Sequence, residues 1–404
     1  MQRNIKPIFK VKRFIEKFVE SALLISGSVT SITILLIVIF LFKEASGMFN
    51  NNVIEDGYVL AMNKSNPVKK LSSYQIKEIF DAKITNWDEL GGKEEPIEVV
   101  RLSDLTNYYT EEELGAEFEN IPAKASELTA KHPGIILFLP EQYVAKKFDG
   151  TLLKHEKLQP GDFFGGNEWY PTASPSPQYG LLPLLLGTIW VSLGAILLSL
   201  PFGIAVSVYL AEIASMRVRN ILKPLIELLA GIPSVVYGFF GLVVIVPFLQ
   251  EFFKLPVGET ALAGSIVLGI MALPTIITVA EDAMRTVPRA IKEASLALGA
   301  THWQTIYKVI IPYAKSGITS AAVLGIGRAI GETMAVLMVT GNAAVIPHSL
   351  LEPVRTIPAT IAAELGEASV GSGHYQALFA LGCVLFLITM LISISIEFIG
   401  KKKY

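Results

Sequence analysis

Residues 317–340 read GITSAAVLGIGRAIGETMAVLMVT and indicate a membrane-spanning helix. The hydrocarbon core of a bilayer, about 30 Å thick, takes roughly 20 mainly apolar residues in a helix. This stretch meets that length, yet it carries Arg328 and Glu332 near its middle. A charge at the bilayer centre costs about 2.5–3.5 kcal/mol on insertion scales, so these groups are expected to face a cavity or a partner.

The spacing of the two charges leaves two interpretations open. In a continuous helix Arg328 and Glu332 would share one face and could pair. Either Arg328 lines an anion pathway, with Glu332 orienting it, or the two form a structural ion pair between helices. Ionisable groups inside a membrane mark pathways by default, which favours the first. Gly327 and Gly331 have the spacing of a surface that packs closely against another helix.

Five other stretches are long and apolar enough to span a membrane. The chain as a whole is 51% hydrophobic and has a mean hydropathy of +0.50. We expect six spans in all, because the following residues qualify besides 317–340: 22–42, 184–211, 222–249, 261–280 and 377–398. The third of these contains Gly231 and Pro233, which predict a bend or a re-entrant piece.

Charge is distributed unevenly along the chain. Residues 44–168 hold 22 acidic and 13 basic side chains, whereas the rest of the chain is basic. An acidic, less apolar segment inside a basic, apolar host indicates an inserted domain. The expected organisation is therefore an N-terminus with the first span (residues 1–49), an insert (50–168) and a core with five spans (169–404).

Basic residues predict the orientation in the membrane. With six spans, both termini and two short loops fall on one side, which the positive-inside rule assigns to the cytoplasm. The insert then lies outside the cell. The basic residues of these segments include Arg3, Lys6, Lys10, Arg217, Arg219, Lys223, Arg285, Arg289, Lys292, Lys308, Lys315, Lys402 and Lys403.

The loop before residues 317–340 has a pattern of its own. Apolar residues at helical spacing predict two short helices that meet at Gly299, which permits the positive φ of a sharp turn. Pro312 is expected to end the second helix. Glu293, Ala294 and Gly299, followed by Val309, Ile311 and Pro312, resemble the EAA loop of ABC importer permeases. That resemblance implies that Glu293, Ala294 and Gly299 contact a cytoplasmic ATPase. An amphipathic helix on the membrane surface is the alternative.

Three stretches resemble phosphate permeases of the PstC type: LGIGRAIGETMAVLMVTGN (324–342), AGIPSVVYGFFGLVVIV (230–246) and NEWYPTASPSPQYGLLPLLLGT (167–188). The resemblance implies an all-α membrane protein with the type I importer permease fold. It also implies a second permease of the PstA type, an ATPase dimer and an extracytoplasmic phosphate-binding protein as partners, in a bacterial inner membrane. Another oxyanion, sulfate or molybdate, remains an alternative cargo.

The insert is expected to form a small α/β unit. NPVKKLSSYQIKEIFDAKITNWDELGGKEEPIEVVR (66–101) resembles part of the periplasmic phosphate-binding proteins. Leu102-Ser103-Asp104 replaces the Ser-Gly-Thr loop that grips the anion in that family, and the insert is acidic. A lobe that docks or replaces a docking surface is therefore favoured over a membrane-anchored phosphate receptor, which remains the second functional class.

Several chemistries find no support in the sequence. It contains no G-x-x-x-x-G-K-[ST] phosphate loop, so ATP hydrolysis is assigned to a partner and no enzymatic activity is expected. The five histidines, His155 among them, show no metal-ligand spacing. No cofactor, metal or nucleic-acid partner is expected. Membrane lipid is expected to surround the permease core.

Overall fold

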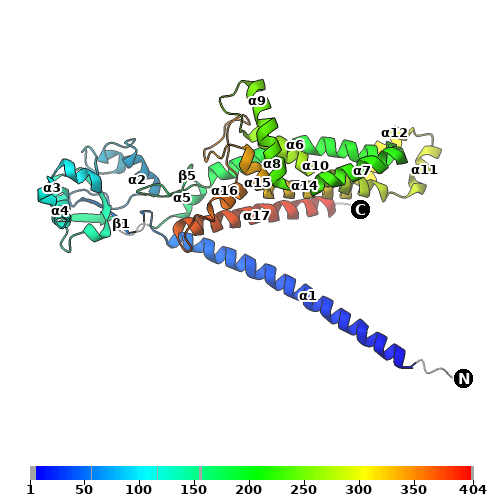
Figure 1. The fold of residues 1–404 in the computed structure, drawn as a ribbon, viewed down its shortest axis with the longest axis horizontal. Helices are drawn as coiled ribbons and strands as arrows, with labels where there is room; N and C mark the ends of the chain where they lie inside the picture. Colours follow the sequence, from blue (N-terminus) through cyan, green and yellow to red (C-terminus); the bar gives the residue numbers. More distant parts are fainter. Residues whose placement is uncertain (1–5, 56, 116, 154–156, 402–404) are drawn as a thin grey trace.

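Four long helices lie side by side and form a bundle (Figure 1) in this computed structural model, which describes residues 6–55, 57–115, 117–153 and 157–401. The central helix is α10, because 61% of its most apolar window is buried, against 28% for α6 and α17. Ser265 of α10 also donates to the Val191 carbonyl of α6 at 3.2 Å. The bundle helices are α6 (Leu182–Val208), α10 (Ala261–Arg285), α14 (Lys315–Gly331) and α17 (Gly373–Lys401).

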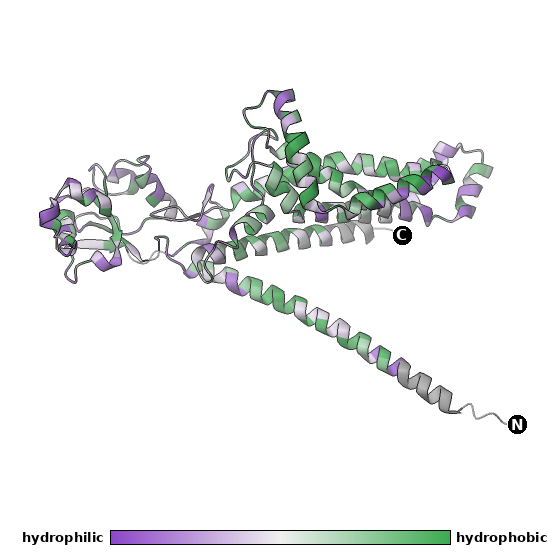
Figure 2. Cartoon of the chain, in the orientation of Figure 1, coloured by the Kyte–Doolittle hydropathy of each residue, from purple (hydrophilic) through white to green (hydrophobic). Residues whose placement is uncertain are grey.

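Among the residues that the structure describes, five helical segments are long and apolar enough to cross a membrane, or six if one bent pair counts as a single span. They coincide with the apolar ribbons of Figure 2. The expected six spans agree with the larger count. The segments are Glu16–Asn50, Leu182–Ile213, Ser234–Phe253, Ala261–Arg285 and Gly373–Ser395, and the bent pair is His302–Tyr313 with Lys315–Gly331.

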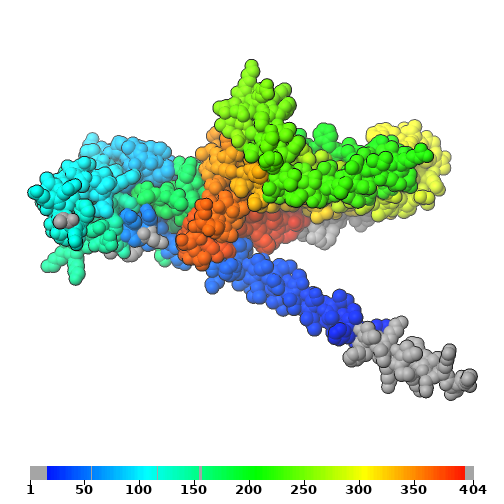
Figure 3. All heavy atoms as spheres, viewed as in Figure 1, coloured from blue at the N-terminus to red at the C-terminus, as the bar shows by residue number. Residues whose placement is uncertain are grey.

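The third expected span, residues 222–249, is wrong at its start. The chain breaks after Gly231 at Ile232 and Pro233, both with extended backbone. Before the break, α7 (Met216–Gly231) is a separate amphipathic helix with no buried residue. After it, α8 (Ser234–Phe240), the π-helix η6 (Gly241–Ile245) and α9 (Val246–Phe253) form an apolar segment, and its α9 end projects from the bundle in Figures 1 and 3.

The fifth expected span, residues 317–340, is not one continuous helix. α14 ends at Gly331, Glu332 is extended with a ψ of 134°, and α15 (Met334–Val339) follows. At its N-terminal end, α14 is bent by 70° from the preceding helical segment, His302–Tyr313. One break, after Gly331, therefore lies within a sequence whose apolar pattern alone predicts a single span, and the 70° bend lies before it, at Ala314.

The loop between α10 and α14 lies at the end of the bundle opposite to the insert (Figure 1). It contains two short helical segments, as expected. α11 (Arg289–Ala297) comes first, and α12 (His302–Thr305), the π-helix η7 (Ile306–Ile310) and α13 (Ile311–Tyr313) follow. Pro312 does not end this helical run, because the break falls at Ala314. The π-helix η5 (Tyr209–Ile213) ends α6 at the same end of the bundle.

The insert folds around a four-stranded sheet of order β2-β3-β1-β4. β3 pairs parallel with β2 and antiparallel with β1. The strands are β1 (Tyr58–Asn63), β2 (Glu98–Arg101), β3 (Ile135–Pro140) and β4 (Gly150–Leu153). Around them lie η1 (Met48–Asn50), α2 (Ser73–Phe80), η2 (Trp87–Leu90), η3 (Leu102–Asn107), α3 (Glu111–Leu114), α4 (Ile121–Lys131), η4 (Glu141–Tyr143) and α5 (Pro160–Phe164).

A segment that we call the stem, residues 169–181, leads from the insert to α6. It holds the two-stranded ribbon of β5 (Trp169–Tyr170) and β6 (Gln178–Tyr179). The long helix α1 (Lys6–Gly47) packs on α17 near its C-terminal end. There the rings of Phe40 and Phe379 lie edge to face, with their centroids 5.6 Å apart. α16 (Ile357–Glu364) precedes α17 at the end of the bundle that carries the insert.

One hydrophobic core runs from the insert into the bundle. Alternate residues of the buried strands face opposite sides of the sheet. Leu60 and Met62 of β1 belong to a cluster that also contains Trp169 of the stem and Leu381 of α17. Val59 and Ala61 face a second cluster under α4. Because the first cluster crosses the junction, burial of apolar surface holds the insert against the bundle.

Candidate functional site

Arg328 lies on α14 facing the central helix of the bundle. Its Nη1 donates to Oγ1 of Thr275 at 3.3 Å, and Thr275 follows Pro274 within α10. Its charge also acts on Tyr237 of α8. Arg328 is only partly buried. A guanidinium with five donors thus has one hydrogen bond to a hydroxyl, which leaves donors for an anion.

Glu332 does not pair with Arg328 in the part of the chain that the structure describes. Because α14 ends at Gly331, the one-face geometry of a continuous helix does not apply. The structure shows no ion pair between Arg328 and Glu332 among the residues that it describes. The close packing expected at Gly327 and Gly331 stays a prediction, since a Cβ at either position would meet nothing within 4 Å in this single chain.

Gly299 turns the chain between α11 and α12, as its position in the sequence predicts. Its φ is +86°. Gly299 N donates to the Leu296 carbonyl at 2.9 Å and Ala300 N to the Ser295 carbonyl at 3.3 Å, the two bonds of a Schellman motif. Thr301 then caps α12 by accepting from Gln304 N. The T-x-x-Q capping box was missed from the sequence, although its spacing is a recognisable signal.

The surface around this turn is apolar and exposed. Leu298 is 90% exposed and Trp303 is 61% exposed. Glu293 and Ala294 lie on exposed positions of α11, a helix with no buried residue. An exposed tryptophan beside an exposed leucine is typical of an interface whose partner is absent.

Two buried carboxylates, both missed from the sequence, lie between this loop and the bundle. Glu281 of α10 is 1% exposed and contacts Arg219 at 2.7 Å, Lys223 at 3.4 Å and Arg285 at 3.5 Å. Glu212 of η5 contacts Lys292 of α11 at 2.5 Å. Arg285 is four residues from Glu281 on the same helix, whereas Arg219, Lys223 and Lys292 lie on other elements than the acids they contact. The spacing in the sequence does not reveal these contacts between elements.

A third carboxylate joins the insert to the bundle. Glu364 of α16 accepts from Trp169 Nε1 of the stem at 3.0 Å and contacts Arg355 and His374 at 2.8 Å each. Burial by itself raises the pKa of Glu364, but the hydrogen bonds from His374 and Trp169 and the Arg355 charge outweigh it and hold the pKa below its ordinary 4.5. The carboxylate therefore stays ionised at neutral pH.

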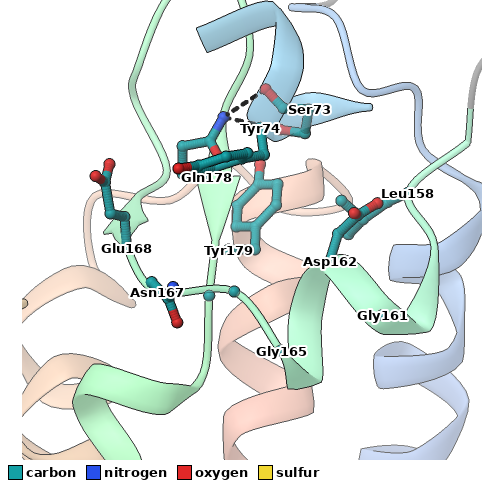
Figure 4. A pocket seen from close by; sticks show the side chains of 12 residues that line it. Ser73, Tyr74, Leu158, Gly161, Asp162, Gly165, Asn167, Glu168, Gln178 and Tyr179 are labelled. Carbon is teal, nitrogen blue, oxygen red and sulfur yellow. Dashed lines mark hydrogen bonds between the residues drawn. The ribbon is translucent and has the colours of Figure 1, made fainter. Parts of the chain in front are cut away.

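A cavity of about 180 Å³ lies where the insert meets the stem (Figure 4). Gln178 Nε2 donates to the hydroxyl of Ser73 at 2.8 Å, and that hydroxyl also contacts Ser176 Oγ at 2.7 Å. Glu168 on its wall pairs with Lys77 at 2.9 Å. Burial lowers the pKa of Lys77, but Asp81 and Glu168 raise it to about 12. The stem thus covers the N-terminal end of α2.

Residues 180–403, more than half of the chain, match the family described as the inner membrane component of binding-protein-dependent transport systems. The chain belongs to this family. Its core is therefore a multi-span membrane subunit of a binding-protein-dependent transport system, and the helical membrane-spanning core expected from the sequence is confirmed.

Two relatives show how far the similarity of this permease extends. It is 42% identical over 246 residues to the probable ABC transporter permease protein YqgH of Bacillus subtilis, covering 61% of this chain and 79% of that one. It is 39% identical over 249 residues to the phosphate transport system permease protein PstC of Mesorhizobium japonicum, covering 57% and 75%. The expected resemblance to PstC-type permeases is confirmed.

Residues 39–155 of the permease match the PBP superfamily domain. A solved structure of an ABC-type phosphate transport receptor from Vibrio cholerae aligns with 27% of this chain and 50% of its own chain. The aligned residues are 26% identical, and the TM-score is 0.20. The family match over residues 39–155 confirms the expected resemblance of the insert to a binding protein.

The loop after β2 of the insert is closed by its own carboxylate. Asp104 accepts from Arg101 N at 2.9 Å, so an acid occupies the backbone N–H that would otherwise face an anion. The α2 N-terminus is covered by the stem through Ser73 and Gln178. Both features disfavour anion binding at these two positions.

No group of three or more potential metal ligands occurs among the described residues of this permease. His155, Arg3, Lys402 and Lys403, which the sequence interpretation used, lie outside the described residues.

Proposed function

We propose that this permease is one half of the translocation pathway of an ATP-driven importer of inorganic phosphate. The observation that carries the proposal is Arg328, a cation in the last turn of α14 whose only hydrogen bond among the described residues goes to Thr275. A fixed cation without a paired carboxylate attracts an anion, and a single weak neighbour leaves it free to release that anion again. The 39% identity to a phosphate transport permease supports phosphate as the cargo.

The second permease subunit would cover the open face of α14. Gly327 and Gly331 present a small-residue surface with nothing within 4 Å, a geometry that admits another helix at close range. A PstA-type subunit there would enclose Arg328 between two chains. Glu332, at the break after α14, would lie at this interface and orient or release the anion.

The exposed loop that contains α11 and α12 would contact the ATPase dimer. Glu293, Ala294 and Gly299 lie in this loop, and its apolar residues Leu298 and Trp303 are exposed. Pro312 belongs to the helical run that follows and sets the approach to the bend at Ala314. With this contact the loop would lie on the cytoplasmic side, and the insert, at the opposite end of the bundle, on the extracytoplasmic side.

The proposed organisation keeps residues 1–49 as N-terminus and first span, 50–168 as insert and 169–404 as permease core. The insert would be a docking lobe for, or beside, the extracytoplasmic phosphate-binding protein. Its closed anion loop and net acidity support docking over a receptor role. Ligand binding needs donors and a positive field, which the insert lacks at these positions.

Phosphate uptake tests the proposal. Cells without other high-affinity uptake would express the permease with its neighbouring transport genes, as wild type, as Arg328→Gln and as Arg217→Gln, an exposed control. Saturable phosphate uptake that sulfate and molybdate do not compete is expected for wild type and control, with at least a tenfold loss for Arg328→Gln. Uptake of sulfate or molybdate by the wild type would show that this oxyanion, and not phosphate, is the cargo. Full phosphate uptake by Arg328→Gln would remove the pathway role.

A further inference from the structure

α11 is attached to the bundle in an unusual way for a helix of nine residues. None of its residues is buried, so apolar packing does not hold it in place. Within the loop, Ser295 Oγ contacts Thr305 Oγ1 at 3.0 Å, which ties α11 to α12 but not to the bundle. Among the described residues, Lys292 supplies the one ion pair between α11 and the rest of the molecule, and its partner is Glu212.

The Glu212–Lys292 pair is short and shielded from solvent. The distance from Lys292 Nζ to Glu212 Oε1 is 2.5 Å, and the exposed fractions of the two side chains are 22% and 7%. A pair with one buried carboxylate is held in one geometry, because breaking it leaves that charge without a partner. An exposed ion pair would be loose and screened by salt.

The position of Glu212 connects this pair to the centre of the bundle. Glu212 lies in η5, which continues α6 directly after Val208. α6 packs along α10, where the Ser265 hydroxyl bonds the Val191 carbonyl. Glu293, the next residue of α11, is exposed. One peptide bond therefore separates this exposed residue, which the proposed function assigns to the ATPase contact, from Lys292, which contacts η5.

Glu281 does not duplicate this connection. Its three basic neighbours lie on α7 and on α10 itself, so it fixes α7 to α10 and does not reach α11. Lys308, in η7, is exposed, and its Nζ lies 5.7 Å from the centroid of the neighbouring Tyr307 ring. The loop thus contains a basic residue that can serve as a matched control.

We propose that Glu212 and Lys292 are positioning residues that transmit movement of the ATPase-docking helix α11 to α6. The inference rests on the proposed ATPase contact of this loop and adds the residues through which that contact reaches the pathway. Loss of the pair would leave the complex assembled and able to hydrolyse ATP. It would reduce the phosphate moved per ATP, because displacement of α11 would no longer displace α6.

The test uses the complete transporter, with its companion permease, ATPase and binding protein, reconstituted in proteoliposomes with inorganic phosphate and ATP. Lys292→Glu and Glu212→Lys each place two like charges together and are expected to lower the phosphate-to-ATP ratio at least fivefold. The exchange of both residues in one chain is expected to restore at least half of the wild-type ratio. Lys292→Arg, which keeps the charge, and Lys308→Glu, the control, are expected to leave the ratio within twofold.

Subunit stoichiometry of each purified complex shows whether the ATPase remains bound. Should a charge reversal prevent assembly, Lys292→Met and Glu212→Gln supply the same comparison without a like-charge contact. An unchanged ratio in assembled single variants would overturn the proposal, as would a double exchange no better than the single variants. Absence of phosphate transport by the wild type would instead reject the cargo, and the ratio of the true cargo to ATP would then test the pair.

Discussion

Trp169 Nε1 donates a 3.0 Å hydrogen bond to Glu364 Oε2, across a separation of 195 positions in the sequence. Trp169 belongs to the stem below the insert, and Glu364 ends α16 beside the bundle. Trp169 is only 1% exposed and shares its hydrophobic cluster with residues of α17. The insert and the permease core therefore meet through both a shared core and a charged hydrogen bond.

Trp169→Phe is expected to loosen this junction. The substitution keeps an aromatic ring but removes the Nε1–H, and a hydrogen bond to a charged group contributes about 1.5–3 kcal/mol. Thermal unfolding of the purified complex should begin several degrees lower than in wild type. Tyr170→Phe changes the exposed neighbour and serves as the control. An unchanged melting curve for Trp169→Phe would show that the bond contributes nothing.

The stability that Glu364 supplies should depend on pH. Because its pKa in the folded protein is held below 4.5, Glu364 stabilises the fold at pH values above the unfolded pKa. That contribution is lost as the pH falls through the lowered folded pKa. The difference in melting temperature between wild type and Glu364→Gln should be constant from pH 7 to pH 5 and shrink below about 4.5.

The groups that face Glu364 are Arg355 and His374. The same series in a His374→Gln background separates titration of the imidazole from that of the carboxylate. A difference that stays constant down to pH 3 in both backgrounds would contradict the assignment to Glu364.

Gly299→Ala should weaken the turn between α11 and α12. A side chain at a φ of +86° costs about 1–2 kcal/mol, although a Cβ there would touch nothing. Less ATPase should then copurify with the permease, and ATP hydrolysis by the complex should fall two- to tenfold. Gly366→Ala is the control, since a Cβ there also meets nothing within 4 Å and its φ is not positive. Equal amounts of copurified ATPase and equal ATP hydrolysis in the two variants would show that the turn at Gly299 is not needed for ATPase contact.

Gln178→Leu should release the insert from the stem. Gln178 Nε2 donates to the Ser73 carbonyl at 3.1 Å and to the Ser73 hydroxyl at 2.8 Å in a buried site. Removing the donor leaves buried acceptors unsatisfied at about 1–3 kcal/mol each. Hydrogen exchange of α2 should accelerate about tenfold, whereas Gln142→Leu at an exposed position of η4 should change nothing. Unchanged exchange in Gln178→Leu would mean that apolar packing alone holds α2.

Much of the functional interpretation was available from the sequence because its signals are local. Gly299 was predicted as a turn, and the turn has a positive φ, since only nearby backbone bonds define a Schellman motif. Arg328 was identified because an arginine in an apolar stretch is visible without coordinates. The break at Glu332 was not predicted, since apolar composition measures length in a membrane and not the continuity of a helix.

Composition and periodicity predict that this chain spans a membrane several times, carries an acidic α/β insert and holds a cation in its fifth apolar stretch. Each segment carries these signals alone. The contacts of Lys292 with Glu212 and of Trp169 with Glu364, and the lack of an Arg328–Glu332 pair among the described residues, are visible only in the folded structure. Such contacts depend on which elements pack together, and burial of distant apolar surfaces sets that packing.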